Sequence, residues 1–264
     1  MNLCLDVGNS QLYGGVFDGA QLVVQFRRTS SPKSSSDELG LFLRAVLREN
    51  HVDPAAIARV ALSSVVPPAV YSIRACCQKY FGVDPLVLRP GLKLGLNVRY
   101  KDPREVGSDR IADALGALKL FPQRDLIIVD YGTATTFTAV TGTREFLGGA
   151  IAPGILVSLE ALVGHAARLP SVEVVPATQT LGLTTVESIQ NGLFWSSVGA
   201  TREIVDRLSQ ECFAGRSAWV VATGGLSYLF NRQDLFDAVV PELILVGLQE
   251  ALTVSTEPGH QALR

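Results

Sequence analysis

The same short motif occurs twice in this chain, each time directly after an apolar run. Asp6-Val7-Gly8-Asn9-Ser10 follows Leu3-Cys4-Leu5, and Asp130-Tyr131-Gly132-Thr133-Ala134-Thr135 follows Leu126-Ile127-Ile128-Val129. Short apolar runs that end in turn residues are typical of buried strands. Because two such strands end in the same motif about half a chain apart, the sequence predicts two related domains that close on one nucleotide.

An Asp at the end of a strand, followed by Gly and a hydroxyl residue, is suited to holding a metal-bound phosphate. The Gly allows a tight turn and a close approach of the backbone, whose N–H groups then face anionic oxygens. Mg²⁺ commonly takes one or two carboxylates together with phosphate oxygens and water. One copy of the motif is equally typical of a plain turn, and the second copy is what favours a phosphate and Mg²⁺ site.

Composition restricts the class of protein. The chain has 264 residues, enough for two modest domains, and its 47% apolar content argues against a disordered chain. The formal net charge is −2 and no Lys/Arg-rich tract occurs, so nucleic acid is not an expected partner. No apolar run is long enough to span a bilayer and no signal peptide is recognisable, so we expect a cytoplasmic protein with no membrane association.

The cysteines and histidines do not predict a metal centre. Cys4, Cys76, Cys77 and Cys212 lack the spacing of metal ligands. Buried, reduced thiols of a cytoplasmic protein are their expected state. The three histidines form no cluster in the sequence either, so a metal site of the His/Cys type is not expected.

The expected order of elements in the first half is three strands, a helix, a strand and a helix, which is typical of a ribonuclease-H-like domain. The strands are expected at residues 3–6, 14–17, 22–26 and 60–66, and the first helix at residues 39–47. The second half repeats this rhythm, with strands at 125–130, 135–141, 145–151 and 218–222 and helices at 155–164, from 184 to about 209, and at 246–254. The long helix opens with a capping box, Thr184-Thr185-Val186-Glu187.

Strands that alternate with helices in this way predict an α/β fold with mixed sheets. The boundary is expected near residues 116–124, after a helix that begins around Ser108. We therefore expect an N-terminal domain over residues 1–118, a C-terminal domain over 119–256 and a flexible tail over 257–264.

Two glycine-rich segments of the second half resemble further ligand loops. Gly224-Gly225 follows a strand and would let an adenine or ribose approach the backbone, although Gly-Gly after a strand is common. The segment 148–154 resembles a tight connection between a strand and a helix, whose backbone amides could assist phosphate binding. A plain connecting loop is the alternative for this second segment.

The segment from Tyr100 to Arg110 carries an acid and a base at a predicted helix start. Asp109 and Arg110 follow Gly107 directly. A helix-start acid that interacts with a nearby base explains such a pair without any function. Beside two phosphate loops, however, the Asp could accept a proton from an attacking hydroxyl, and the Arg could orient a carboxylate or phosphate.

Taken together, these motifs resemble those of type III pantothenate kinases, in the superfamily of acetate and sugar kinases, Hsp70 and actin. The resemblance spans nearly the whole chain in the family's order. It rests on seven segments: 6–10, 63–67, 100–110, 130–135, 148–154, 185–192 and 222–225. It implies an actin-like ATPase duplication of two ribonuclease-H-like domains. Two positions differ, because the family often has Ala where this chain has Ser108 and Asn where it has Asp102.

The resemblance also implies a reaction and a set of roles. The enzyme would transfer the γ-phosphate of ATP to the primary hydroxyl of pantothenate, giving 4'-phosphopantothenate, the first step of coenzyme A biosynthesis. Asp109 would be the general base, Asp6 would bind Mg²⁺, Asp130 would ligate K⁺ or NH₄⁺, and Thr133 would contact ATP. The first phosphate loop would comprise Asp6, Val7, Gly8, Asn9, Ser10, Gln11, Leu12 and Tyr13. Pantothenate would contact Tyr100, Gly107, Ser108, Asp109, Arg110 and Thr185. Family members are homodimers, so a homodimer is expected.

Two other functions fit parts of the pattern. A small sugar or acid kinase would keep the superfamily and change the acceptor, but the short chain and the segment 107–110 oppose it. A silent nucleotide-binding regulator belongs to a different class, since some relatives were first described as accessory factors for transcription. Asp6, Asp109 and Asp130 are all present, which opposes a silent protein. ATP turnover in the presence of pantothenate discriminates between these functions.

Overall fold

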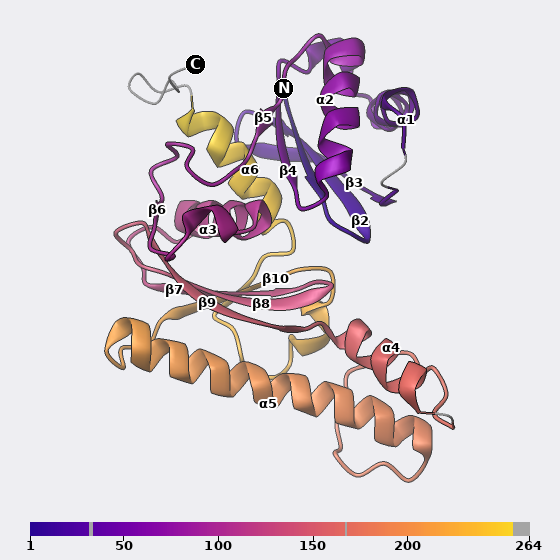
Figure 1. Ribbon diagram of the computed structural model, residues 1–264, viewed down its shortest axis with the longest axis vertical. Coiled ribbons are helices and arrows are strands. Elements are labelled where there is room, and N and C mark those ends of the chain that lie inside the picture. Colours follow the sequence, from indigo (N-terminus) through magenta and orange to yellow (C-terminus); the bar gives the residue numbers. More distant parts are fainter. Residues whose placement is uncertain (32–33, 167, 256–264) are drawn as a thin grey trace. The chain divides into compact units, whose positions relative to one another are not determined.

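Two mixed sheets, each accompanied by helices, make up the computed structural model, which describes residues 1–31, 34–166 and 168–255 (Figure 1). The chain divides into two units. The first comprises residues 1–120 and the last helix, and the second comprises residues 121–242. The expected tail over 257–264 lies outside the described residues. No helix in the described ranges is long and apolar enough to cross a membrane.

The sheet of the first unit has the strand order β3-β2-β1-β4-β5. β1 is antiparallel to β2 and parallel to β4. The strands are β1 (Asn2–Val7), β2 (Gln11–Asp18), β3 (Gln21–Thr29), β4 (Arg59–Ser64) and β5 (Leu86–Val87). A further short strand, β6 (Asn97–Val98), is not part of this sheet. The strands expected near residues 3–6, 14–17, 22–26 and 60–66 are thereby confirmed; the first three are longer than expected, whereas β4 ends at Ser64, two residues before the expected end.

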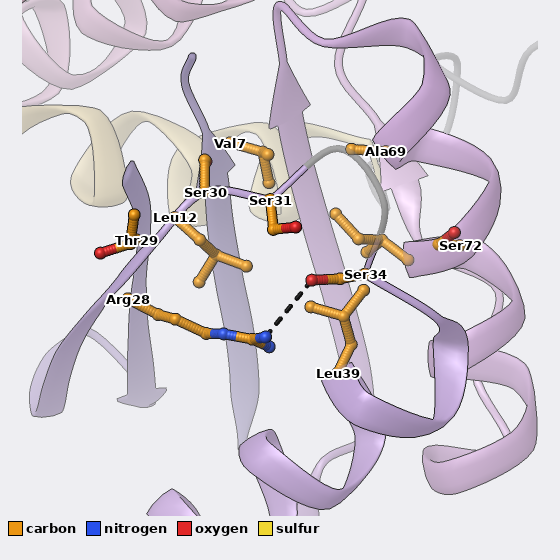
Figure 2. A pocket seen from close by; sticks show the side chains of 11 residues that line it. Val7, Leu12, Arg28, Thr29, Ser30, Ser31, Ser34, Leu39, Ala69 and Ser72 are labelled. Atoms are coloured by element: carbon orange, nitrogen blue, oxygen red, sulfur yellow. Dashed lines mark hydrogen bonds between the residues drawn. The ribbon is translucent and has the colours of Figure 1, made fainter. Parts of the chain in front are cut away.

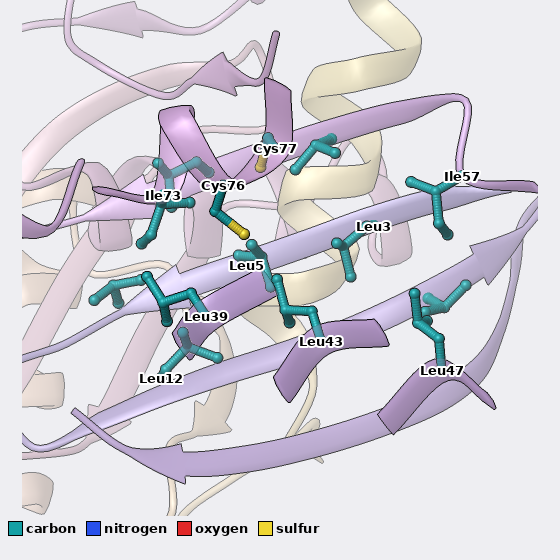
Figure 3. Close-up of a cluster of buried hydrophobic side chains, with 14 of the residues drawn as sticks. Leu3, Leu5, Leu12, Leu39, Leu43, Leu47, Ile57, Ile73, Cys76 and Cys77 are labelled. Atoms are coloured by element: carbon teal, nitrogen blue, oxygen red, sulfur yellow. The ribbon is translucent and has the colours of Figure 1, made fainter. Parts of the chain in front are cut away.

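Two helices, α1 (Ser36–Glu49) and α2 (Pro67–Phe81), pack with this sheet in one apolar core. Figure 3 shows Leu5 of β1 beside Leu43 of α1 and Cys76 of α2, with Ile73 of α2 in the same cluster. Burying a leucine or isoleucine of this kind stabilises the fold by about 1.5–3 kcal/mol. α1 begins with a capping box between Ser35 and Glu38, which explains why the helix starts after the Ser-rich segment.

The last helix differs from its expected place. α6 (Leu243–Val254) packs on α3 (Ser108–Leu120) and on β1 and β4 of the first unit, whereas we expected it in a C-terminal domain over 119–256. Two glycines allow the helices to approach closely. A Cβ on Gly247 would overlap the Ala112 carbonyl group, and one on Gly116 would overlap the Leu243 carbonyl oxygen. The helix is strongly apolar, and nothing local in its sequence indicates which sheet it covers.

The sheet of the second unit runs β11-β10-β7-β8-β9. Its strands are β7 (Leu126–Tyr131), β8 (Ala134–Val140), β9 (Glu145–Pro153), β10 (Trp219–Thr223) and β11 (Ala238–Val239). Its helices are α4 (Ile155–His165) and α5 (Thr185–Phe213), and the predicted capping box of Thr184 and Glu187 is present at the start of α5. The core includes stacked rings, with Tyr131 and Phe230 at a centroid distance of 4.5 Å. The Tyr131 hydroxyl lies 2.7 Å from the Thr201 hydroxyl, and burial raises its pKa.

The two units repeat one arrangement. In each, the first strand lies between an antiparallel second strand and a parallel fourth strand, and a short parallel strand follows the fourth. The third strand is antiparallel to the second in both. β1 therefore corresponds to β7, β2 to β8, β3 to β9, β4 to β10 and β5 to β11. This correspondence confirms the predicted duplication of a ribonuclease-H-like unit with a mixed sheet.

The reactivity of the four cysteines tests which of them are buried. Burial raises the pKa of the Cys76 and Cys77 thiols to about 12 and raises that of the Cys4 thiol as well. A raised pKa keeps a thiol protonated at pH 8, and the thiolate is the reactive form. Partial burial and the neighbouring Glu211 raise the pKa of the Cys212 thiol as well, but Cys212 is half-buried whereas the other three are buried. We therefore expect a short iodoacetamide pulse at pH 8 to label Cys212 first and to spare the other three until guanidinium unfolds the protein. Peptide mass spectrometry measures this order, and comparable native labelling of Cys76 would contradict the buried positions.

Candidate active site

The first motif forms a tight turn at the end of the central strand of the first unit. The Gly8 N–H donates to the Gln11 carbonyl oxygen at 2.9 Å, which closes the turn between β1 and β2. Ser30 fastens the turn to the end of β3, because its hydroxyl donates to the Gly8 carbonyl oxygen at 2.6 Å and its N–H donates to the Ser10 carbonyl oxygen. Of the predicted phosphate loop over residues 6–13, only residues 8–10 form this anchored turn, because the pairing of β1 with β2 takes up the residues on either side.

Asp6 lies in a row of side chains that crosses the sheet. It is directly opposite Tyr13 of β2 and directly opposite Ser63 of β4. Residues in register on neighbouring strands point to the same face of a sheet. The half-buried Asp6 carboxylate is thus flanked by two hydroxyl residues at the carboxyl end of β1.

The start of α3 is attached to the same edge of the sheet through Ser108. The Ser108 and Ser63 hydroxyl oxygens are 3.0 Å apart, and both side chains are buried. The Ser108 hydroxyl also accepts from the Ser64 N–H and donates to the Ser64 carbonyl oxygen, each at 3.2 Å. A serine hydroxyl has one hydrogen and two lone pairs, so Ser63 then acts as the donor to Ser108. This network brings Asp109, the next residue, to the end of the sheet where β1 and β4 end and where Asp6 lies.

Asp109 is held by the local backbone. Its Oδ1 accepts a hydrogen bond from the Arg110 N–H at 2.8 Å. A carboxylate in the first turn of a helix interacts favourably with the positive end of the helix dipole. A Cβ on Gly107 would overlap Asp109 Oδ1, so glycine at position 107 leaves room for this carboxylate.

Arg110 links Tyr100 to the start of α3, which carries Asp109. Arg110 is buried, and its Nη1 donates to the Tyr100 hydroxyl at 3.1 Å. The intervening loop contains a short 3-10 helix, η2 (Pro103–Glu105), which Asp102 caps by accepting from the Arg104 N–H at 3.0 Å. Hydrogen bonds from Arg104 lower the pKa of the Asp102 carboxyl. The structure therefore brings together the predicted residues Tyr100, Gly107, Ser108, Asp109 and Arg110, near Asp6.

The second motif forms a corresponding turn in the second unit. Asp130 lies at the end of β7, opposite Thr136 of β8 and Thr223 of β10. Gly224 follows β10 with a φ of 89°, and a Cβ there would overlap Asp130 Oδ1. The Gly154 N–H donates to the Thr133 carbonyl oxygen at 3.1 Å, and a Cβ on Gly154 would overlap the carbonyl oxygens of residues 132 and 133. Three glycine-containing loops thus meet around Asp130 and Thr133.

Two expectations differ in this unit. The segment 148–154 was expected to be a connection between a strand and a helix, but β9 continues through Pro153, and only Gly154 lies at the start of α4. The pairing of β9 with β8 through Pro153 explains the difference, because it satisfies the backbone that a loop would expose. Thr185 lies on another element, as the exposed first residue of α5.

The residues fit the ions that the motifs predict. Mg²⁺ in phosphotransferases needs only one or two carboxylates beside phosphate oxygens and water, and Asp6 supplies one next to a turn with backbone N–H groups. The described residues contain no group of three or more His, Cys, Asp or Glu that could form an all-protein metal cage. At Asp130, the carboxylate lies between Thr136 and Thr223 in register on the neighbouring strands, which supplies oxygen atoms of the kind that a cation takes as ligands.

Sequence reasoning left two contributors without a role. Ser63 and Ser64 belong to one of the seven motif segments, and in the structure they make the contact that places α3. Gly154 belongs to another segment, and in the structure it lies against the second turn. A buried serine pair at the end of an apolar strand is a usable signal, because a buried hydroxyl needs a partner.

The duplicated units, each with an Asp-x-Gly turn at the end of its central strand, define the chain as a protein of the actin-like ATPase fold. An activator of 2-hydroxyisocaproyl-CoA dehydratase from Clostridium difficile, solved with bound ADPNP, has this fold in common with the chain. Its TM-score is 0.52 at 13% identity, over 96% of this chain and 95% of that one. The family model for type III pantothenate kinase matches residues 2–207, so the chain belongs to that family.

Curated relatives agree over nearly the full length. The chain is 48% identical over 256 residues to the type III pantothenate kinase of Legionella pneumophila (strain Corby), which covers 97% of this chain and 100% of that protein. It is 45% identical over 252 residues to the type III pantothenate kinase of Elusimicrobium minutum (strain Pei191), covering 96% and 98%. Identity at this level over whole chains extends well beyond the motifs themselves.

Proposed function

We propose that this protein is an ATP-dependent pantothenate kinase, which transfers the γ-phosphate of ATP to the primary hydroxyl of pantothenate in the first step of coenzyme A biosynthesis. Membership of the family and relatives with that name support the acceptor. The observation that carries the proposal is the hydrogen bond between Ser63 and Ser108, because it brings Asp109 to the edge of the sheet where Asp6 lies. An acid beside a phosphate loop is the arrangement that a kinase needs.

Each residue has a role in this proposal. The loop from Asp6 to Tyr13 and Thr133 bind ATP, while Tyr100, the segment 107–110 and Thr185 bind pantothenate. Asp109 orients the pantothenate hydroxyl and accepts its proton as the oxygen attacks the γ-phosphorus and the bond to the leaving ADP oxygen breaks. Phosphoryl transfer has a loose transition state, so orientation and charge neutralisation contribute more than the strength of the base. Mg²⁺ held at Asp6 would neutralise phosphate charge when bound.

A monovalent cation, K⁺ or NH₄⁺, is proposed to bind at Asp130. The support is the Asp130 carboxylate at the carboxyl end of β7, with the hydroxyl residues Thr136 and Thr223 directly opposite it on the neighbouring strands. We expect turnover of the parent protein to be stimulated by K⁺ over Na⁺, and we expect Asp130→Asn to weaken or abolish this response, because the amide removes the charge. The measurement is coupled ADP release as a function of K⁺ concentration. A mutant with the parental K⁺ curve would refute the assignment.

We further propose that the protein is a homodimer in the cytoplasm. Exposed apolar side chains on α4 and around the start of α5 support the dimer, because such surfaces commonly mark protein contacts. They are Leu156, Val157, Leu162, Leu181, Leu183 and Val186. Thr185 lies among them, so a dimer interface here would be close to a residue that is proposed to bind pantothenate. The formal net charge of −2 supports partners other than nucleic acid or membranes.

The first test is ADP release with Mg·ATP and pantothenate, compared with a panel of sugars and small hydroxy acids. Pantothenate-dependent turnover is the expected result, and it would exclude a silent nucleotide-binding regulator. Turnover with another acceptor and none with pantothenate would replace the proposal with the sugar or acid kinase alternative. Light scattering of the same sample measures the oligomeric state, and a monomer would contradict the proposed dimer.

A further inference from the structure

An arginine extends the row of side chains that contains Asp6. Arg27 of β3 is directly opposite Tyr13 of β2, and its guanidinium carbon lies 3.7 Å from the centre of the Tyr13 ring. The strand registers therefore place Ser63, Asp6, Tyr13 and Arg27 in one row across four neighbouring strands. Residues opposite one another share a face of the sheet, so Arg27 lies on the same face as Asp6.

This face is the one away from α1 and α2. Figure 2 shows Leu12 and Arg28, the sequence neighbours of Tyr13 and Arg27, lining a pocket with Leu39 of α1 and Ala69 of α2. Successive residues of a strand point to opposite faces. Arg27 therefore points to the other side of the sheet, which is the side that Ser108 contacts through Ser63.

The charge of Arg27 is not balanced by an acid in the described part of the chain. Its Nη1 donates to Oε1 of Gln11 at 3.3 Å, and its other contact is the Tyr13 ring. Both partners are neutral. The exposed Arg74, by comparison, forms an ion pair with Asp84. Stacking on an aromatic ring fixes the guanidinium plane while leaving N–H groups at its edge, which is how arginine recognises phosphate.

We infer that Arg27 binds the triphosphate of the nucleotide held by the loop from Asp6 to Tyr13, an inference that rests on the proposed function. Two strand spacings, about 10 Å in all, separate β1 from β3. An extended arginine side chain and a phosphate chain that starts at Asp6 cover this gap together. Tyr13 positions the guanidinium, and the guanidinium neutralises charge on the transferring end of ATP, which is the main electrostatic demand of phosphoryl transfer.

The test compares nucleotides that differ in their phosphate chains. We expect Arg27→Ala to weaken binding of Mg·AMP-PNP and to raise KM for Mg·ATP, each by about 10- to 100-fold, as the loss of a charge-assisted hydrogen bond predicts. Affinity for AMP and KM for pantothenate should stay at parental values. Arg27→Lys keeps the charge but loses the planar guanidinium that stacks on Tyr13, so it should recover only part of the loss. The control is Arg48→Ala, which removes an exposed arginine at the end of α1 and should change none of these values.

The outcomes separate this inference from the proposed function. If the parent phosphorylates pantothenate and Arg27→Ala leaves both Mg·AMP-PNP affinity and KM for Mg·ATP unchanged, the role of Arg27 is wrong while the kinase stands. An equal loss of AMP and Mg·AMP-PNP binding would also overturn it, because that result indicates a structural effect. If the parent shows no turnover with pantothenate, the proposed function fails, and the binding of Mg·AMP-PNP and of AMP, measured by titration calorimetry, still decides the role of Arg27.

Discussion

Asp109→Asn is expected to lower kcat by about 10²- to 10⁴-fold while the protein folds normally, since this is the usual contribution of a general base. The substitution keeps the size and hydrogen-bonding reach of the side chain and removes its ability to accept the proton. The Arg110 N–H that Asp109 Oδ1 accepts from can be satisfied equally by the Asn carbonyl oxygen. KM for Mg·ATP should therefore change little, because the nucleotide loop lies on other elements.

The matched control is Asp102→Asn. Asp102 lies on the same segment, and its main contacts are with Arg104, including a cap that an Asn side chain can also provide. We expect kcat near the parental value for this variant. Turnover of Asp109→Asn close to that of the parent would remove Asp109 from the role of base. A parallel fall of kcat in both variants would indicate that the loss arises from the segment as a whole.

The parts of the site that sequence could predict are the local ones. A strand that ends in Asp and continues into Gly is encoded by consecutive residues, so both turns were identifiable, and the structure places Asp6 and Asp130 at equivalent ends of β1 and β7. The capping box of α5 is equally local and was confirmed. The duplicated strand order was predictable because alternating runs and turn residues recur in both halves of the chain.

The remaining features depend on partners far apart in the sequence. The contact of Ser63 with Ser108 requires knowing that α3 begins beside the end of β4. The stacking of Arg27 on Tyr13 requires the register of a hairpin, which is set by the whole pairing of β2 with β3. α6 is apolar, and its place depends on a close approach to α3 that Gly116 of α3 and Gly247 of α6 allow.

The close contact of Gly247 with α3 predicts a large loss of stability when this glycine is replaced. Gly247→Ala is expected to destabilise the protein by about 3 kcal/mol, because the added methyl group would overlap the Ala112 carbonyl group and force α6 away from α3. The apparent Tm should fall by about 6–12 °C for a protein of this size. Thermal unfolding followed by circular dichroism measures the change.

Gly199→Ala is the matched control, because Gly199 also lies within a helix but has open space beside it. Alanine is favoured over glycine in a helix by about 1 kcal/mol, so this variant should keep or raise the parental Tm. Equal destabilisation by both substitutions would contradict the close crossing of α3 and α6. Asp109 is on the same helix as Ala112, so a Gly247→Ala protein that still folds should also lose kcat. Gly247 contacts no substrate in the proposed site. A loss of kcat in this variant would therefore show that the packing of α6 on α3 is needed to position Asp109.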